Sequence, residues 1–162
     1  MILGLSIAAL TMAHVVISLV GILTGLVWLV AQVRGVWLPR TNMVFLVTTI
    51  LTSLTGFLFP FNGMTPAIAT GIVSMLVLAV ALFALIRSGP RRLYTAAASA
   101  ALYLNCFVLV VQSFLKIDAL HALAPTQVEP PFAAAQGLVL VALATLGWIA
   151  VRRSRVTAAA SV

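Results

Sequence analysis

Five long apolar runs make up most of the chain, and short segments containing arginine, proline or glycine separate them. The runs lack the two-residue alternation of barrel strands and are too long for such strands. Each supplies about the 20 apolar residues that an α-helix needs to cross the hydrocarbon layer of a bilayer. The pattern therefore predicts five transmembrane helices, over residues 3–33, 43–61, 66–86, 93–115 and 132–151.

Proline and glycine mark the connections between the runs, because neither residue continues a helix easily. Pro39 ends the first connection, and Gly89 and Pro90 divide the third and fourth runs. The longest connection covers residues 116–131. We therefore expect an all-α integral membrane protein with one membrane domain over residues 1–162, folded as a compact bundle of five helices.

The composition agrees with a chain whose surroundings are lipid. Of the 162 residues, 64% are hydrophobic and only 7% are charged. A soluble domain carries roughly a quarter charged residues. The sequence therefore predicts that the chain's main partner is the lipid bilayer.

The formal net charge of +7 raises the question of nucleic-acid binding. The basic residues stand in short clusters between apolar runs, and they form neither a continuous basic stripe nor an aromatic platform, so no nucleic-acid partner is expected. Eight of the nine are arginines: Arg34, Arg40, Arg87, Arg91, Arg92, Arg152, Arg153 and Arg155.

The same arginines give an orientation in the membrane. If five helices span, the first connection, the third connection and the C-terminal tail share one side, and all eight arginines lie there. Such a bias marks the cytoplasmic side. We expect the N-terminus outside and the C-terminus in the cytoplasm of a bacterial-type inner (plasma) membrane. Four spans would distribute the arginines over both sides.

Polar and small residues of the first run recur at spacings of three and four, so they share one stripe of a helix. Such a stripe serves helix packing, because small residues let backbones approach and polar groups avoid lipid. Its histidine also allows a second interpretation, in which it binds a ligand or handles a proton. The stripe comprises His14, Ser18, Gly21, Gly25, Trp28 and Gln32.

The second run repeats the small-residue pattern. Thr48, Thr52 and Gly56 are spaced by four, which is typical of a close helix–helix contact. Threonine hydroxyls in helices commonly bond the carbonyl four residues earlier. We expect packing, and no ligand, on this face.

The fourth run contains the strongest polar set. Asn105, Gln112 and Lys116 fall on one stripe, and Gln136 begins the fifth run. Two amides in one span are costly in lipid unless they find partners. They either bond neighbouring helices or line a cavity, and Lys116 either joins that cavity or extends to the outer headgroups.

In the expected orientation, these polar residues lie mainly in the half of the membrane nearer the outer surface. We therefore predict an outward-facing polar cavity that binds a small amphipathic or anionic molecule, with His14, Asn105, Gln112, Lys116 and Gln136 as its lining. The alternative is a non-catalytic structural or accessory subunit, whose polar stripes contact its own helices, a second copy or a partner in a membrane complex. A membrane enzyme acting on lipid or quinone is the third hypothesis.

The sequence contains few residues that could carry out catalysis or bind a cofactor. The only two acids, Asp118 and Glu129, lie outside the apolar runs, whereas coupled transport usually relies on carboxylates within the membrane. Cys106 is a single thiol without metal-ligand spacing. Phosphate-binding glycine loops and the common hydrolase motifs are absent. We expect no metal and no cofactor, and the sequence favours a protein that is not an enzyme.

Overall fold

The structure is a computed structural model, and it describes residues 6–59, 66–87 and 89–159. Within these ranges the chain forms helices and no strand, so the prediction of an all-α protein is confirmed. The helices are α1 (Ile7–Val33), α2 (Pro39–Gly56), α3 (Pro66–Ile86), α4 (Arg91–Lys116), α5 (Asp118–Leu123) and α6 (Pro130–Ala159).

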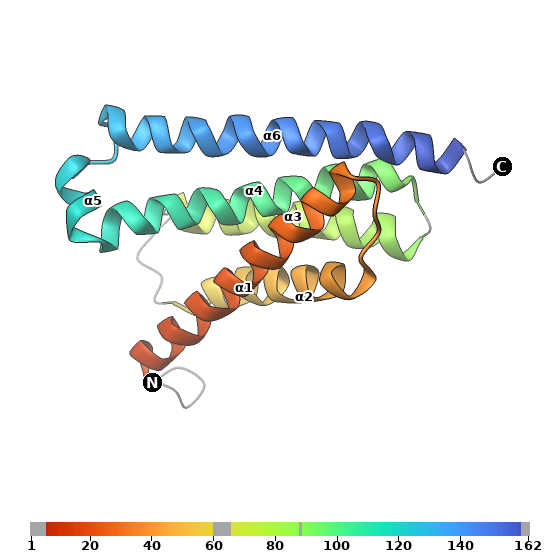
Figure 1. Ribbon diagram of the computed structural model, residues 1–162. Coiled ribbons are helices and arrows are strands. Elements are labelled where there is room, and N and C mark those ends of the chain that lie inside the picture. Colours follow the sequence, from red (N-terminus) through yellow and green to blue (C-terminus); the bar gives the residue numbers. More distant parts are fainter. Residues whose placement is uncertain (1–5, 60–65, 88, 160–162) are drawn as a thin grey trace.

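Helix α4 is the centre of the bundle. It packs against α3 and α6 along its length, and α1 packs mainly against α2. Figure 1 shows α2, α3, α4 and α6 running side by side, whereas α1 crosses them obliquely. Helix α1 also contacts α4 and α6, so it lies against three helices of the bundle, with α2 as its main neighbour. The short α5 lies at the end of α4 that is remote from the last turns of α6 (Figure 1).

Four helices among the described residues are long and apolar enough to cross a membrane, namely α1, α4, residues Ile68–Ile86 of α3 and residues Pro130–Ser154 of α6. Helix α2 does not meet this criterion. Its 18 residues include one arginine, one asparagine and several hydroxyl side chains. The chain therefore has the composition of a multi-pass membrane protein with four candidate spans.

The outer surface of the bundle is apolar. Met12 is 67% exposed, Leu76 is 64% exposed and Leu138 is 73% exposed, and they lie on three different helices. Contiguous apolar surface on several helices is rare in soluble monomers. In a bilayer the same side chains contact lipid tails.

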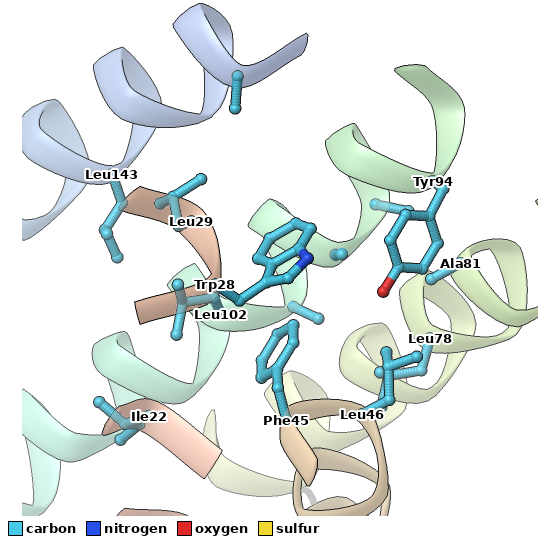
Figure 2. Close-up of a cluster of buried hydrophobic side chains, with 14 of the residues drawn as sticks. Ile22, Trp28, Leu29, Phe45, Leu46, Leu78, Ala81, Tyr94, Leu102 and Leu143 are labelled. Atoms are coloured by element: carbon cyan, nitrogen blue, oxygen red, sulfur yellow. The ribbon is translucent and has the colours of Figure 1, made fainter. Parts of the chain in front are cut away.

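Aromatic packing fills the interior between α1, α2 and α4. Trp28 is fully buried and stacks on Phe45, with ring centroids 5.5 Å apart. Tyr94 meets the same indole edge-on at 6.0 Å. Figure 2 shows the indole of Trp28 above Phe45 and to the left of Tyr94, with Leu102 at its lower left. This cluster fixes how α1 lies across α2 and α4.

The helix ends follow from local chemistry. The Ser6 hydroxyl caps α1 by accepting from the Ala9 amide at 3.1 Å. At the other end Gly35 adopts a φ of +76°, which a residue without a Cβ tolerates best. Pro39 occupies the first turn of α2, where its missing N–H would lack a helical partner in any case.

The helix bounds differ from the sequence-based ones at several places. Helix α2 begins at Pro39 rather than Met43, because a proline starts a helix well. Helix α6 continues past residue 151 to Ala159. The expected start at Leu3 and the expected end at Phe61 lie outside the described residues.

Candidate functional site

His14 faces the last turn of α2. Its Nδ1 lies 2.8 Å from Oγ1 of Thr55, and its ring meets that of Phe59 edge-on at 5.4 Å. A Cβ atom added at Gly56 would lie 3.7 Å from Cε1 of the imidazole, which is an ordinary van der Waals contact. The Ser18 hydroxyl donates to the His14 carbonyl at 2.7 Å. The histidine thus links α1 to α2.

The small residues predicted to pack also face α2. A Cβ atom at Gly21 would lie 3.1 Å from Oγ1 of Thr48, whose hydroxyl bonds the Val44 carbonyl at 2.7 Å. Gly25 lies still closer to its neighbours, on Phe45 and Leu102. These contacts allow the close crossing of α1 over α2.

Asn105 is buried between α4 and α2. Its Nδ2 donates to Oγ1 of Thr49, a long hydrogen bond of 3.4 Å. Thr49 also accepts a bond at its carbonyl from the Ser53 hydroxyl, and Ser53 in turn lies 3.1 Å from the Ser74 hydroxyl of α3. A chain of polar groups therefore joins α4, α2 and α3 in the middle of the bundle. Thr52, also on α2, has a buried hydroxyl without a partner among the described residues.

Gln112 and Lys116 continue the stripe of Asn105 toward the end of α4. The Gln112 side chain is half-buried and makes no hydrogen bond to the part of the chain that the structure describes. Lys116 is the last residue of the helix and is exposed. This end of the stripe therefore carries a positive charge and a half-buried amide that has no hydrogen bond within the described ranges.

Gln136 approaches α4 from α6. Its Nε2 donates to the Phe107 carbonyl at 3.2 Å, and its Oε1 is buried without a partner among the described residues. Among the five candidate residues themselves, no hydrogen bond connects any pair within the described ranges. The structure thus places three of them at three different helix contacts: His14 between α1 and α2, Asn105 between α4 and α2, and Gln136 between α6 and α4.

The segment after α4 folds over the end of the bundle and contains residues that the sequence analysis did not single out. Within it, the helix α5 replaces part of the expected loop. The Nδ1 of His121 lies 3.2 Å from the Phe114 carbonyl, and Nε2 of Gln127 donates to the Val111 carbonyl at 2.8 Å. Gln127 has a left-handed φ of +61°. Phe114 packs edge-on against Phe132 at 5.4 Å, which holds the start of α6 on α4.

Glu129 organises the end of this segment. Its carboxylate accepts from the amide and hydroxyl of Thr126, at 3.2 and 2.9 Å, and from the Val128 amide at 3.1 Å. Desolvation acts to raise the pKa of Glu129, but the hydrogen bonds to the charged form outweigh it and the net pKa is lowered. The Glu129 carboxylate is therefore part of a turn, and these hydrogen bonds give it a structural role.

Two hollows lie at the opposite, arginine-rich end. The smaller, of about 20 Å³, is surrounded by Gln32, Trp37, Arg91, Tyr94, Thr95 and Arg153, among others. The wider one, of about 450 Å³, is an open apolar depression beside Leu26, Val30 and Arg34 on α1. Gln32 belongs to the predicted packing stripe of the first helix, but the sequence does not indicate that it lies near these arginines.

Metal ligands are not gathered anywhere in the described residues, since no group of three or more His, Cys, Asp or Glu side chains lies together there. Cys106 is a buried free thiol on α4.

In comparisons with protein families, with curated proteins and with solved structures, the chain has no match.

Proposed function

We propose that this chain is a small inner-membrane protein that binds an amphipathic or anionic small molecule at the outer end of its bundle. The observation that carries the proposal is the pair of incompletely paired amides there. Gln112 makes no hydrogen bond to the described residues, and Gln136 buries an unpaired carbonyl oxygen. A bound molecule would satisfy both groups.

The energetic argument concerns polar groups in an apolar medium. An unpaired buried donor or acceptor costs roughly 1–3 kcal/mol. A ligand with a donor for Gln136 would remove such a penalty there, and an acceptor on the same ligand would pair the half-buried Gln112 amide. Lys116 adds the positive charge that would attract an anionic head to the same end. The apolar side chains between the helices would hold the rest of an amphipathic molecule.

The proposal includes five spans, with the N-terminus outside and the C-terminus in the cytoplasm. Helix α2 has 18 residues, so it is about 27 Å long, close to the thickness of a hydrocarbon core. With α2 as a span, the connection after α1, the connection after α3 and the end of α6 share one side. The arginines of those segments then follow the bias of cytoplasmic loops.

A second candidate function is a non-catalytic accessory subunit of a membrane complex. It is favoured by the polar side chains that already find partners inside the bundle. His14 with Thr55, and Asn105 with Thr49, are contacts of helix packing. Polar bonds of this kind between membrane helices contribute about 0.6 kcal/mol on average. In this alternative the protein needs no ligand.

The experiment that separates the two functions is native mass spectrometry of the full chain in a mild detergent, with an absorption spectrum of the same sample. For the binding protein we expect a retained small molecule that is lost in Gln112→Leu while thermal stability stays close to wild type. Ser113→Ala is the control, because Ser113 is the neighbouring residue of α4 and its hydroxyl already donates to the Leu109 carbonyl at 2.8 Å.

Two results would contradict binding at the outer end. One is a protein that carries only bulk lipid or a second polypeptide, which favours the accessory subunit. The other is a loss of thermal stability in Gln112→Leu as large as the loss of ligand, which indicates that the amide serves packing.

A further inference from the structure

The wider depression at the arginine end has two apolar walls. One wall is a stripe of α1 that contains Val27 and Val30 and ends at Arg34. The other wall is formed by Val36 and Leu38 of the connection to α2. Arg34 is the only charged residue of the lining, and the volume is about 450 Å³. Sites for small molecules are usually of this size, roughly 300–1,000 Å³, and mainly apolar.

The end of α1 explains why the second wall stands beside the first. The Val36 amide donates to the Ala31 carbonyl at 2.9 Å, and the Gly35 amide donates to the Gln32 carbonyl at 3.0 Å. With Gly35 in the left-handed region, these two bonds form a Schellman motif, which reverses the chain at the end of a helix. The reversal holds Val36 next to the last turns of α1, so the shape of the depression is set by backbone hydrogen bonds.

Both walls are open to the surroundings of the bundle. Val27 is 55% exposed, Val30 is 40% exposed and Val36 is 47% exposed. Helix α1 is one of the candidate spans, so these side chains face lipid. An apolar depression that no neighbouring atoms fill loses dispersion contacts along its whole lining. A flexible hydrocarbon chain is the part of a membrane that can enter and restore them.

The depth of the depression in a bilayer follows from its residues. Trp37 lies in the same connection, with the Arg91 guanidinium over its ring at 5.2 Å, and tryptophan is enriched at the level of the headgroups. Arg34 and Val27 are two helical turns apart, so about 10 Å separate them along the axis of α1. With Arg34 among the headgroups, Val27 lies within the hydrocarbon.

The rim of the depression favours an anion. Arg34 is exposed and makes no ion pair with the described residues. Helix α2 begins directly after Leu38 without a side-chain cap, so the positive end of its dipole also borders the depression. The C-terminal dipole of α1 acts in the opposite sense, but it amounts to about half a charge, and the full charge of Arg34 exceeds it.

We propose that this depression binds one anionic phospholipid, with an acyl chain between the two walls and the phosphate at Arg34. Arginine suits the phosphate because its fork of N–H groups matches the phosphate oxygens. The lipid fits because its charge and its hydrocarbon are joined in the same order as Arg34 and the valines of α1. The site is at the opposite end of the bundle from the proposed small-molecule site and does not depend on it.

Charge also argues against a second copy of the chain as the occupant. Two copies inserted in the same orientation would bring their arginine ends together. Neither copy supplies an acid there, because the only two acids, Asp118 and Glu129, lie beyond the far end of α4. Such a contact would place like charges side by side, whereas a phospholipid brings the opposite charge.

The test of the charge uses the full-length protein in a nonionic detergent. Phosphatidylglycerol and phosphatidylcholine with the same acyl chains are titrated separately, and occupancy is measured by native mass spectrometry. We expect one phosphatidylglycerol per chain, bound about fivefold more tightly than phosphatidylcholine, as for one arginine near an anionic headgroup. Arg34→Gln should remove this preference. Arg92→Gln is the matched control, since Arg92 is also exposed but does not line the depression, and it should keep the preference.

The test of the apolar walls fills the depression. Val30→Trp places an indole between the walls and should weaken phosphatidylglycerol binding about tenfold, which corresponds to roughly two methylene groups no longer buried. Val141→Trp is the control, because Val141 is 65% exposed on α6 and does not line the depression. If Val30→Trp does not fold, Val27→Trp replaces it, since Val27 belongs to the same wall one turn earlier and is more exposed.

Three results would overturn the proposal. Equal binding of the two lipids, or equal weakening by Arg34→Gln and Arg92→Gln, would show that Arg34 does not select the headgroup. Unchanged binding in both tryptophan variants of α1 would place the lipid elsewhere on the bundle. A dimer that is lost in Val30→Trp and kept in Val141→Trp would assign the depression to a second copy of the chain.

Discussion

Gly25 of α1 faces Leu102 of α4 so closely that an added Cβ atom would lie 2.7 Å from the leucine Cδ1. On its other side the same atom would lie 2.8 Å from the Phe45 ring of α2. Such distances are shorter than ordinary carbon–carbon contacts. The absence of a side chain at one residue therefore lets three helices meet beside Trp28.

Gly25→Ala should lower the free energy of unfolding by about 1–3 kcal/mol, the usual cost of overpacking a filled interior. The measurement is a reversible unfolding titration in mixed micelles. Gly137→Ala is the control, since an added Cβ there meets nothing within 4 Å and α6 is helical at that residue. It should be neutral or stabilising, by up to about 1 kcal/mol. Equal effects of the two substitutions would contradict the close contact.

The bond between His14 and Thr55 predicts a measurable coupling. In a double-mutant cycle with His14→Phe and Thr55→Val, the interaction free energy should be about 0.5–1.5 kcal/mol. Additive effects of the two substitutions would show that the hydrogen bond contributes nothing to folding. Loss of a bound molecule in His14→Phe without loss of stability would move the histidine from packing to ligand binding.

Glu129 predicts a pH dependence of the segment after α5. Its pKa is lower in the folded protein than the ordinary value of 4.5, so the folded state favours the charged carboxylate. The contribution is therefore complete above pH 4.5 and disappears as the pH falls through the lowered pKa. Hydrogen exchange should find the Thr126 and Val128 amides protected at neutral pH and faster in Glu129→Gln.

The comparison at acidic pH completes this test. Below the lowered pKa, wild type and Glu129→Gln should exchange these amides at the same rate, once the intrinsic pH dependence of exchange is subtracted. A difference that persists there would assign the protection to packing instead of the carboxylate.

The proposed topology, with α2 as a fifth span and the N-terminus outside, predicts where labels react. A fluorescent reporter fused after Val162 should fold in the cytoplasm, and alkaline phosphatase at the same site should be inactive. In a Cys106→Ser background, Phe57→Cys and Ala119→Cys should react with an impermeant maleimide from outside, whereas Arg34→Cys should react only after permeabilisation. Labelling of Phe57→Cys from the same side as Arg34→Cys would mean that α2 does not cross.

The sequence was sufficient for the class of fold, because lipid imposes a long apolar helix on each span. It predicted less well where local chemistry decides the structure. Pro39 extends α2 toward its N-terminus as a first-turn residue, although apolar character begins only later. Residues Asp118–Leu123 form a helix too short to give a clear periodicity. The left-handed Gln127 gave no sequence signal, since such a backbone is uncommon for its residue type.

The candidate residues illustrate a second limit. Periodicity predicts which side chains share a stripe of one helix, but it does not indicate which neighbouring helix that stripe meets. His14 and Asn105 both face α2, yet they contact different turns of it, at Thr55 and Thr49. Gln32 was visible on the first stripe, and only the packing of α4 and α6 brings Arg91 and Arg153 beside it.

The separation of the arginines from the two acids makes the folded chain an electric dipole along its long axis. A membrane potential acts on each charge moved across it with about 2.3 kcal/mol per 100 mV. With the arginine end on the negative side, inverted insertion would move several positive charges against this field. The proposed orientation therefore implies that copies facing both ways in one membrane are disfavoured, and that antiparallel pairing of two copies is rare for the same reason.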